Sequence, residues 1–494
     1  LHGSIHSFPT RRSSDLRLHD HAALALALAR CRHIHVAFVL DTGILAPLPR
    51  NDRRVAFIRD TLAALDEALR ALAGRAACGL IVRHGVAADV VPELAMQLGA
   101  SAVFASHDDE PASLARDNAV RTALTRQRCE FHTVKDHVVF ERRDLLTQGG
   151  TPYTVFTPYA RAWRARLSAV GVQTHSTDEL PGRLADRPDR LAVPVPTLGD
   201  IGFTSPHGPP LDAGPQGARA ALQAFWPRAA RYDTTRDVPA LDSTSRLGVH
   251  LRFGTLSIRE LVALAAPTPA PDGTQRPDDA RATWLNELIW RDFFAQIMAH
   301  FPHAMTGAFR AEYDALAWEQ GAAADAHFAA WCDGRTGYPI VDAAMRQLNN
   351  TGFMHNRVRM VAASFLVKDL GLDWRRGEAY FADRLDDFDL ASNNGNWQWA
   401  ASTGCDAQPW FRIFNPVLQA RKFDPRGEFI RQWLPELGHL PTGVLHDFST
   451  LAPLERASLP ASYPATPCVD HAEARERTLA RYGAVRGAAG ARAS

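Results

Sequence analysis

Three kinds of pattern are missing from this chain of 494 residues, and each absence excludes a class of protein. No run of eighteen apolar residues occurs, so a membrane-spanning helix is not expected. The six cysteines are scattered without a CxxC pair, which argues against a disulfide framework or a zinc site and favours reduced thiols in the cytoplasm. No GxGxxG motif follows a candidate strand, so a classical dinucleotide site is not expected either.

The composition is that of a globular protein with two or more domains. Apolar residues make up 46% of the chain and charged residues 22%, and the chain is long enough to bury a sizeable core. The formal net charge is only +1, so the surface as a whole is not basic. A single basic face remains compatible with this small total.

Strands and helices alternate in the first part of the chain. The candidate strands are 33–41, 78–85, 100–108 and a segment near 131–140. The candidate helices between them are 55–72, closed by Gly74, then 86–100 and 111–127. This alternation predicts a parallel, doubly wound sheet.

The rest of the chain has a different organisation. Residues 171–217 are rich in proline, glycine and serine, as expected of an interdomain linker, and a helical pattern follows it. The stretch 266–279 interrupts that pattern and predicts an exposed loop. The expected parts are a leader at 1–14, an α/β domain at 15–140, a linker with short helices at 141–230, an all-helical domain at 231–485, and a tail at 486–494.

The first fifteen residues, LHGSIHSFPTRRSSD, fit neither a signal peptide nor a regular element. They show no strand or helix periodicity, although ordered sequence follows directly. We expect residues 1–14 to be foreign sequence introduced by cloning or sequence assembly.

Two blocks in the helical half combine polar and aromatic residues. STSRLGVHLRFGTLS (243–257) places hydroxyls and an arginine near a helix start, where backbone N–H groups bind phosphates. An ordinary Ser/Thr N-cap explains the same residues, and it is the favoured interpretation when this block is taken alone. WLNELIWRDFF (284–294) places Trp284, Glu287 and Arg291 on one helical face. Its charges are therefore either paired with each other or used to bind a ligand.

Three further blocks have a similar character. TGYPIVDAAMRQLNNTGFMHNRVRM (336–360) brings arginines suited to phosphates beside a methionine suited to flat rings. DDFDLASNNGNWQW (386–399) is too polar for a core helix and too aromatic for a loop. PWFRIFNPVLQARKFDP (409–425) is aromatic and basic, as in segments that follow a nucleic-acid strand.

Together these blocks resemble the photolyase/cryptochrome flavoproteins, and in particular the bacterial photolyases that repair cyclobutane pyrimidine dimers. The resemblance runs from Asp15 to about residue 482 and depends on TSRL, WLNELIWR, TGYPIVDAAMRQL, MHNRVRM and NNGNWQWAASTG in this order. It implies an N-terminal α/β domain with a doubly wound, Rossmann-like parallel sheet. A larger all-α, FAD-binding domain would follow it.

The resemblance also implies a set of FAD-binding residues. By motif match they are Tyr232, Thr244, Ser245, Arg246, Leu247, Trp284, Glu287, Arg291, Arg359, Asp387, Asp389 and Asn393. The first five would hold the phosphates, and Arg359 and Asp387 would form the pair beside the flavin. Asn393 would face flavin N5, where a neutral amide tolerates the N5 proton of a reduced anionic flavin and a carboxylate would repel the added charge.

The implied reaction is driven by light. Excited FADH⁻ would give one electron to a dimer flipped out of UV-damaged DNA, the cyclobutane ring would split, and the electron would return. The lesion pocket would be formed by Glu287, Trp290, Asn356, Met360 and Trp399. The candidates for backbone phosphates, which would make binding sensitive to salt, are Arg357, Arg412, Arg421 and Lys422.

Three tryptophans match the family's electron relay from the flavin to the surface. They are Trp397, Trp374 and Trp318, and the relay would photoreduce oxidised FAD. A plain core role remains an alternative for Trp318.

The sequence favours dimer repair over three other functions. A cryptochrome-type blue-light receptor would not need the lesion pocket, and the chain leaves little room for a signalling tail. A (6-4) photoproduct enzyme would need a histidine acid, for which His355 is available, but the dimer-repair enzymes that the sequence resembles carry that histidine too. A structural DNA-binding module would not explain the carboxylates and amides of the flavin pocket.

The remaining expectations concern partners and single positions. An antenna, either methenyltetrahydrofolate or a deazaflavin, could bind at 106–117, where Glu110 is compatible with it. We expect a cytoplasmic monomer that binds single- or double-stranded damaged DNA and no membrane. Asn396 replaces an expected glycine, Asp386 is expected to be solvated, and Asn394 has no assigned role.

Overall fold

The computed structural model describes residues 3–9, 15–266 and 279–493. The described chain forms two units. Unit 1 comprises Leu1–Pro152, Pro158–Pro227 and Ser245–His300, and unit 2 comprises Tyr153–Thr157, Arg228–Thr244 and Phe301–Ser494. Within the described residues, no helix has both the length and the apolar character needed to cross a bilayer.

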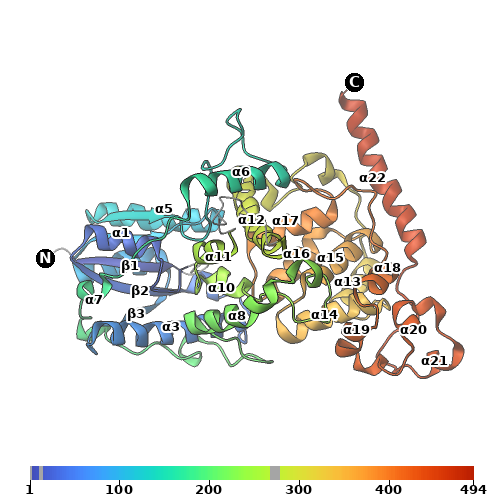
Figure 1. Cartoon of the computed structure of the whole chain (residues 1–494), viewed down its shortest axis with the longest axis horizontal. Coiled ribbons are helices and arrows are strands. Elements are labelled where there is room, and N and C mark those ends of the chain that lie inside the picture. The colour runs from blue at the N-terminus through green and yellow to red at the C-terminus, as the bar shows by residue number, and fades with distance from the viewer. Residues whose placement is uncertain (1–2, 10–14, 267–278, 494) are drawn as a thin grey trace, which may run out of the picture. The chain divides into compact units, whose positions relative to one another are not determined.

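Unit 1 is built on a parallel sheet of five strands in the order β3-β2-β1-β4-β5 (Figure 1). The strands are β1 (Gly3–Pro9), β2 (His33–Asp41), β3 (Leu80–Gly85), β4 (Ala100–Ser106) and β5 (Glu130–Val134). The helices of its first part are α1 (Ala22–Arg30), α2 (Thr42–Leu45), α3 (Arg53–Ala73), α4 (Ala87–Leu98) and α5 (Pro111–Arg126). The predicted doubly wound parallel sheet is therefore confirmed.

Alternating side chains of β2 supply two hydrophobic cores, one on each face of the sheet. Val36, Phe38 and Leu40 pack with residues of α1 and α3, whereas Ala37 and Val39 pack with residues of α4 and α5. This follows from the two-residue period of a strand, which sends successive side chains to opposite faces. The predicted strand at 33–41 coincides with β2.

The first strand departs from the sequence expectation. The sequence predicts no strand before residue 15, yet Gly3–Pro9 pairs in parallel with β2, from Gly3 opposite His33 to Pro9 opposite Val39, and also with β4. The prediction that this segment lacks strand structure was wrong, because strand pairing uses backbone groups that every residue except proline supplies. The foreign origin of the segment stays a prediction.

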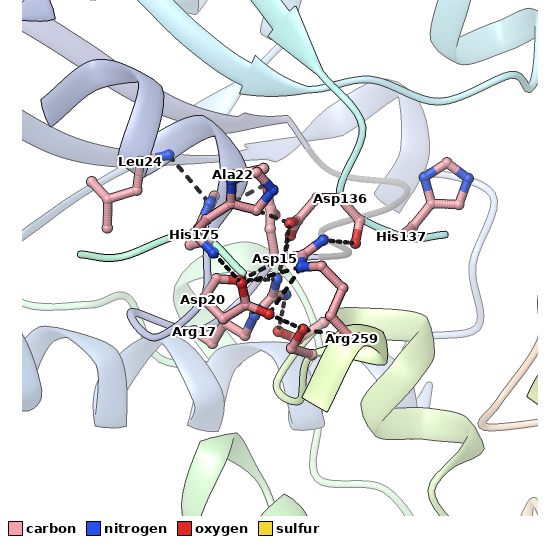
Figure 2. A network of polar contacts seen from close by, with 12 residues as sticks. Asp15, Arg17, Asp20, Ala22, Leu24, Asp136, His137, His175 and Arg259 are labelled. Atoms are coloured by element: carbon pink, nitrogen blue, oxygen red, sulfur yellow. Dashed lines mark hydrogen bonds and ion pairs between the residues drawn. The ribbon is translucent and has the colours of Figure 1, made fainter. Parts of the chain in front are cut away.

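A buried ionic network lies beyond the ends of β1 and β5 (Figure 2). Arg17 Nη2 lies 2.6 Å from Asp136 Oδ2, and Arg259 bridges Asp20 at 2.9 Å and Asp136 at 2.7 Å. Burial by itself raises the pKa of Asp136, but the neighbouring cations outweigh burial and hold that pKa below its usual range. The network ties residues that follow β1 and β5 to α11 (Ile258–Ala265), which is far away in the sequence.

The predicted linker contains regular elements of unit 1. They are α6 (Phe156–Val170), α7 (Leu180–Arg183) and α8 (Gly214–Ala229), with single 3-10 turns at Asp189–Leu191 and Gly199–Ile201. Unit 1 also includes α10 (Gly248–Phe253), α11 (Ile258–Ala265) and α12 (Asp279–His300), which the sequence assigned to the helical domain. Most of the predicted loop at 266–279 lies outside the described residues.

Unit 2 is helical. Its α-helices are α9 (Tyr232–Thr235), α13 (Ala322–Asp333), α14 (Pro339–Thr351), α15 (Asn356–Ser364), α16 (Trp374–Arg384), α17 (Leu390–Ala401), α18 (Pro416–Phe423), α19 (Glu428–Trp433), α20 (Thr442–His446), α21 (Pro453–Ala457) and α22 (His471–Ala493). A π-helical turn, Phe365–Asp369, follows α15. A core centred on α13 to α17 holds these helices together. The predicted tail at 486–494 is instead a continuation of α22 as far as Ala493.

Candidate functional site

The predicted site residues fall in both units, and the larger group belongs to unit 2. Asp389 is the N-cap of α17, and its Oδ1 accepts a hydrogen bond of 2.9 Å from the backbone N–H of Ser392. This cap fixes the start of the helix that carries Asn393. Asn393 is buried and its Nδ2 donates to the backbone oxygen of Glu378 at 3.1 Å. No hydrogen bond among the described residues uses its Oδ1, which can therefore accept one from a ligand.

The neighbouring amide, Asn394, lies in a buried polar chain. Its Nδ2 donates to Glu378 Oε1 at 3.0 Å, and its Oδ1 accepts from Gln398 Nε2 at 3.0 Å. Burial raises the pKa of Glu378 to about 7. Asn394, to which the sequence alone assigns no role, therefore orients the carboxyl group of Glu378, which lies next to Asn393.

The structure also shows the surroundings of two other residues in 386–399, Asp386 and Asn396. Asp386 is 6% exposed and packs against Gly352, so the expectation that it is solvated was wrong. Asn396 is exposed, and its Nδ2 donates to the backbone oxygen of Ser392, one turn earlier, at 2.7 Å. The side chain that replaces the expected glycine thus bonds to its own helix.

The predicted arginine–aspartate pair is formed. Arg359 Nη2 lies 3.0 Å from Asp387 Oδ2, and Arg359 Nε donates to the backbone oxygen of Met354 at 2.7 Å. Both side chains are about a quarter exposed, at 25% and 23%. The pair is therefore held in place and still open to a ligand on one side.

Helix α15 presents Asn356 and Met360 four residues apart, on the same face. Asn356 is exposed and Met360 is half-buried, as needed for contact with a large flat ligand. His355 caps this helix by accepting from the N–H of Arg357 at 3.2 Å. Burial lowers the pKa of His355 to about 4, so the imidazole is neutral at pH 7.

The candidate phosphate contacts differ in their present partners. Arg357 Nη2 lies 2.8 Å from Asp237, and its guanidinium stacks 4.2 Å from the ring centroid of Phe423. Arg421 lies 3.3 Å from Asp447 and is half exposed. Arg412 and Lys422 are exposed. The last two are therefore the better placed of the four for a backbone phosphate.

Two of the three relay tryptophans are fully buried, and the third, at the predicted outer end, is less so. Trp397 is 2% exposed and Trp374 1% exposed, whereas Trp318 is only partly buried. Trp399, predicted to flank the lesion, is also partly buried. No pair of relay rings is in direct ring contact in the described part of the chain, and the relay stays a prediction.

The predicted residues of unit 1 lie on and before α12. Trp284 is buried against Phe225, with ring centroids 5.2 Å apart. Trp290 is half-buried and stacks on Phe294 at 5.3 Å. Arg291 donates to the backbone oxygens of His137 and Leu251, which fixes its guanidinium within unit 1.

The other predicted residues lie around the short helices α9 and α10. Tyr232 is buried at the start of α9, under the guanidinium of Arg236, and Glu287 is half-buried on α12. Ser245 Oγ accepts from the N–H of Leu247 at 3.4 Å, and Arg246 has a positive φ of 53°. Thr244 and Ser245 are half-buried. The hydroxyl groups therefore precede α10, as predicted, and Ser245 forms a local turn there.

Comparison with known proteins connects these residues to one family. A model for DNA photolyase matches residues 12–181, and a model for the FAD binding domain of DNA photolyase matches residues 284–484. The deoxyribodipyrimidine photo-lyase of Escherichia coli (strain K12) is 40% identical over 487 residues, covering 96% of this chain and 97% of that protein. The chain belongs to the DNA photolyase family.

Solved structures of the family agree with this assignment. The bacterial class III photolyase from Agrobacterium tumefaciens has a TM-score of 0.84 with 32% identity, and each chain is covered to 98%. The cryptochrome of Synechocystis sp. PCC6803 has a TM-score of 0.82 with 26% identity, covering 97% of this chain and 99% of that one. The photolyase-type architecture, an α/β domain with a helical FAD-binding domain, is thereby confirmed.

This photolyase-family chain has the FAD-binding domain, and the described side chains fit that cofactor. Asn393 offers an acceptor for a ring N–H, and the Arg359–Asp387 pair offers both a donor and an acceptor. Trp397 lies on the same helix as Asn393, and its indole N–H is buried without a hydrogen-bond partner among the described residues. The individual roles stay predictions.

Two residues near this site were not predicted from the sequence. Glu378 stands four residues after Trp374, so its position on the same helical face could have been inferred. Trp331 is fully buried and its ring lies 6.1 Å from that of Trp397. Nothing in the local sequence of Trp331 distinguishes it from an ordinary core tryptophan.

Proposed function

We propose that this protein repairs cyclobutane pyrimidine dimers in DNA by a light-driven electron transfer. The observation that carries the proposal is the arrangement on α15 and α17. One helix presents Asn356 and Met360 to a ligand, and the other presents Asn393 next to the half-buried carboxyl group of Glu378. When bound, reduced FAD supplies the electron that opens the cyclobutane ring under illumination.

The residues of the chain divide into holding, orienting and excluding roles. Arg359 and Asp387 hold the ring system, and Asn393 accepts a hydrogen bond from a protonated ring nitrogen. Met360 and Trp399 offer apolar surface to flat rings, and Asn356 offers an amide that reads a base edge. Glu287 and Trp290, both on α12 of unit 1, are also proposed to contact the lesion.

The neutral state of His355 favours dimer repair over (6-4) photoproduct repair. An imidazole with a pKa of about 4 is neutral at pH 7, and neutral imidazole is a far weaker acid than imidazolium. Its Nε2 is buried without a hydrogen-bond partner among the described residues, and burial is the largest cause of the low pKa. His355 is therefore a helix cap in this proposal and not a catalytic acid.

The partners and the location are also part of the proposal. The protein would act as a monomer on UV-damaged DNA, with Arg412 and Lys422 as exposed phosphate contacts. The six unpaired cysteines favour the cytoplasm. An antenna, either methenyltetrahydrofolate or a deazaflavin, would bind at 106–117, where Glu110 is buried at the start of α5.

Binding in the dark separates repair from a receptor function. A duplex with one thymine dimer should bind more tightly than the undamaged duplex, and Met360→Asp should abolish that difference because it places a charge against the flipped bases. Asn396→Ala is the matched control, since Asn396 is exposed and bonds only to its own helix. Equal affinity for both duplexes, with flavin bound, would favour the cryptochrome reading.

A further inference from the structure

The ring contacts of Trp397 lead away from the predicted relay. Its ring lies 5.0 Å from Phe381 and 6.1 Å from Trp331, in edge-to-face geometry with both. Within the described residues no ring contact joins Trp397 to Trp374. The tryptophan in closest ring contact with Trp397 is therefore one that the relay does not use.

Trp331 belongs to a continuous aromatic cluster formed by α13 and α16. Its ring lies 5.9 Å from Phe381 in a stacked arrangement and 5.7 Å from Tyr380 at an angle of 65°. The side chain is fully buried, and its Nε1 donates to the backbone oxygen of Ala362 at 3.1 Å. Because electron tunnelling weakens steeply with distance, rings in van der Waals contact are the favoured route through a protein interior.

Tyr380 connects this cluster to the surface. Its side chain is half-buried, and its hydroxyl donates to Asn349 Oδ1 at 2.7 Å and also contacts the backbone oxygen of Cys332 at 3.2 Å. A phenol that loses an electron also loses its hydroxyl proton, because the oxidised phenol is a strong acid. The Asn349 amide lies on the exposed side and leads that proton to water.

We propose that Trp331 and Tyr380 form a second electron route to Trp397, parallel to the route through Trp374. Trp397 donates one electron to photoexcited oxidised FAD, Trp331 then donates one electron to Trp397, and Tyr380 donates one to Trp331 while its proton leaves through Asn349. A thiol in solution returns one electron and one proton to Tyr380, and two of the resulting thiyl radicals combine to a disulfide. The route rests on the proposed flavin site.

The tyrosine at the end of the second route makes electron transfer along it slower than along the route through Trp374. A neutral tyrosine must release its proton as it is oxidised, whereas a tryptophan can hold the charge for a time. The guanidinium of Arg384, 5.4 Å from the centroid of Tyr380, opposes positive charge on that ring. The second route is therefore the slower one and becomes visible when Trp374 is removed.

The test measures photoreduction of oxidised FAD under blue light with dithiothreitol as the thiol. Trp374→Phe should slow photoreduction without abolishing it, and Trp374→Phe combined with Trp331→Phe should lower it to the level of Trp397→Phe. Tyr380→Phe in the Trp374→Phe background should act in the same direction and keeps the test valid if Trp331→Phe does not fold. Trp433→Phe is the matched control, because Trp433 is a partly buried tryptophan of unit 2 with no ring contact to Trp397.

A second readout does not depend on the flavin spectrum. After illumination of Trp374→Phe without thiol, mass spectrometry should find oxidation products at Trp331 and Tyr380, and the melting temperature should show that each variant is folded. Trp374→Phe that is already as slow as Trp397→Phe, or a double variant no slower than Trp374→Phe, would overturn the second route. Failure of the unaltered protein to bind FAD would instead count against the proposed function.

Discussion

At the residue scale, the position of Trp397 depends on a missing side chain. Gly377 lies on α16 against the Trp397 indole, and a Cβ there would overlap the ring. Interior packing tolerates such an overlap only if the ring or the helix moves. A glycine inside a helix ordinarily costs stability, so its presence here reflects the need to bring α16 and α17 together.

We expect Gly377→Ala to destabilise the protein by about 1–3 kcal/mol, the usual cost of overpacking a core. Urea denaturation measures this change, and the flavin content of the purified variant should fall with it. Gly483→Ala is the control, because Gly483 is also helical but a Cβ there meets no atom within 4 Å. A neutral or stabilising Gly377→Ala would contradict the close packing of these helices.

The half-buried carboxyl group of Glu378 predicts a pH dependence. Its pKa rises from 4.5 to about 7 on folding, because burial disfavours the charged form. The folded protein therefore binds a proton more tightly than the unfolded chain does. The stability that this proton contributes is fully present below about pH 4.5 and is lost as the pH rises through 7.

Glu378→Gln keeps the oxygen that accepts from Asn394 but cannot ionise. We compare the free energy of unfolding of the variant with that of the unaltered protein at each pH. We expect the difference to favour the variant by about 1–2 kcal/mol more at pH 8 than at pH 5. Urea denaturation at the two pH values measures the difference. The same difference in stability at both values would show that Glu378 does not titrate in this range.

Some single residues could be predicted and others could not, for a physical reason. Asp389 and Asn393 lie in a motif whose spacing is local, so their positions on α17 follow from the sequence. The burial of Asp386 depends on Gly352, and the place of Trp331 depends on the packing of α13 against its neighbours. Such contacts join distant segments and leave no periodic signal.

At the scale of elements, periodicity predicted strands and helices reliably where each face of the element packs against a single core or faces solvent. β2 alternates between two cores, and α3 ends at Gly74 in the left-handed conformation that its glycine permits. The predicted linker was harder, because α6 and α8 lie among proline-rich segments that dominate the composition. The first strand was missed since its residues are not those of a buried strand.

Strand β1 carries an unusual sequence for its central position in the sheet. Central parallel strands are normally runs of valine, isoleucine and leucine, whereas this one reads GSIHSFP. Replacing Gly3–Pro9 with an apolar, β-branched strand of equal length should raise the melting temperature. A polar scrambled segment of the same length is the control, and no gain over it would argue that the present sequence is native to this position.

At the scale of the whole molecule, the division of the chain differs from the sequence expectation. Unit 1 takes in Ser245–His300, whose Arg259 enters the ionic network with Asp20 and Asp136 (Figure 2). The predicted domain boundary at residue 230 was placed after the proline- and glycine-rich stretch at 171–217. Long-range ion pairs of this kind cannot be read from composition, so the order of elements was predictable and their grouping was not.

At this scale the protein is expected to repair cyclobutane pyrimidine dimers in the light, and one direct measurement tests this expectation. The purified protein, with its flavin chemically reduced, is mixed with an oligonucleotide that contains one thymine dimer, and the intact dimer is quantified by chromatography in the dark and under near-ultraviolet or blue light. We expect the dimer to disappear and two thymines to be restored only under illumination. A protein that binds FAD and the oligonucleotide but leaves the dimer intact in the light would contradict the account.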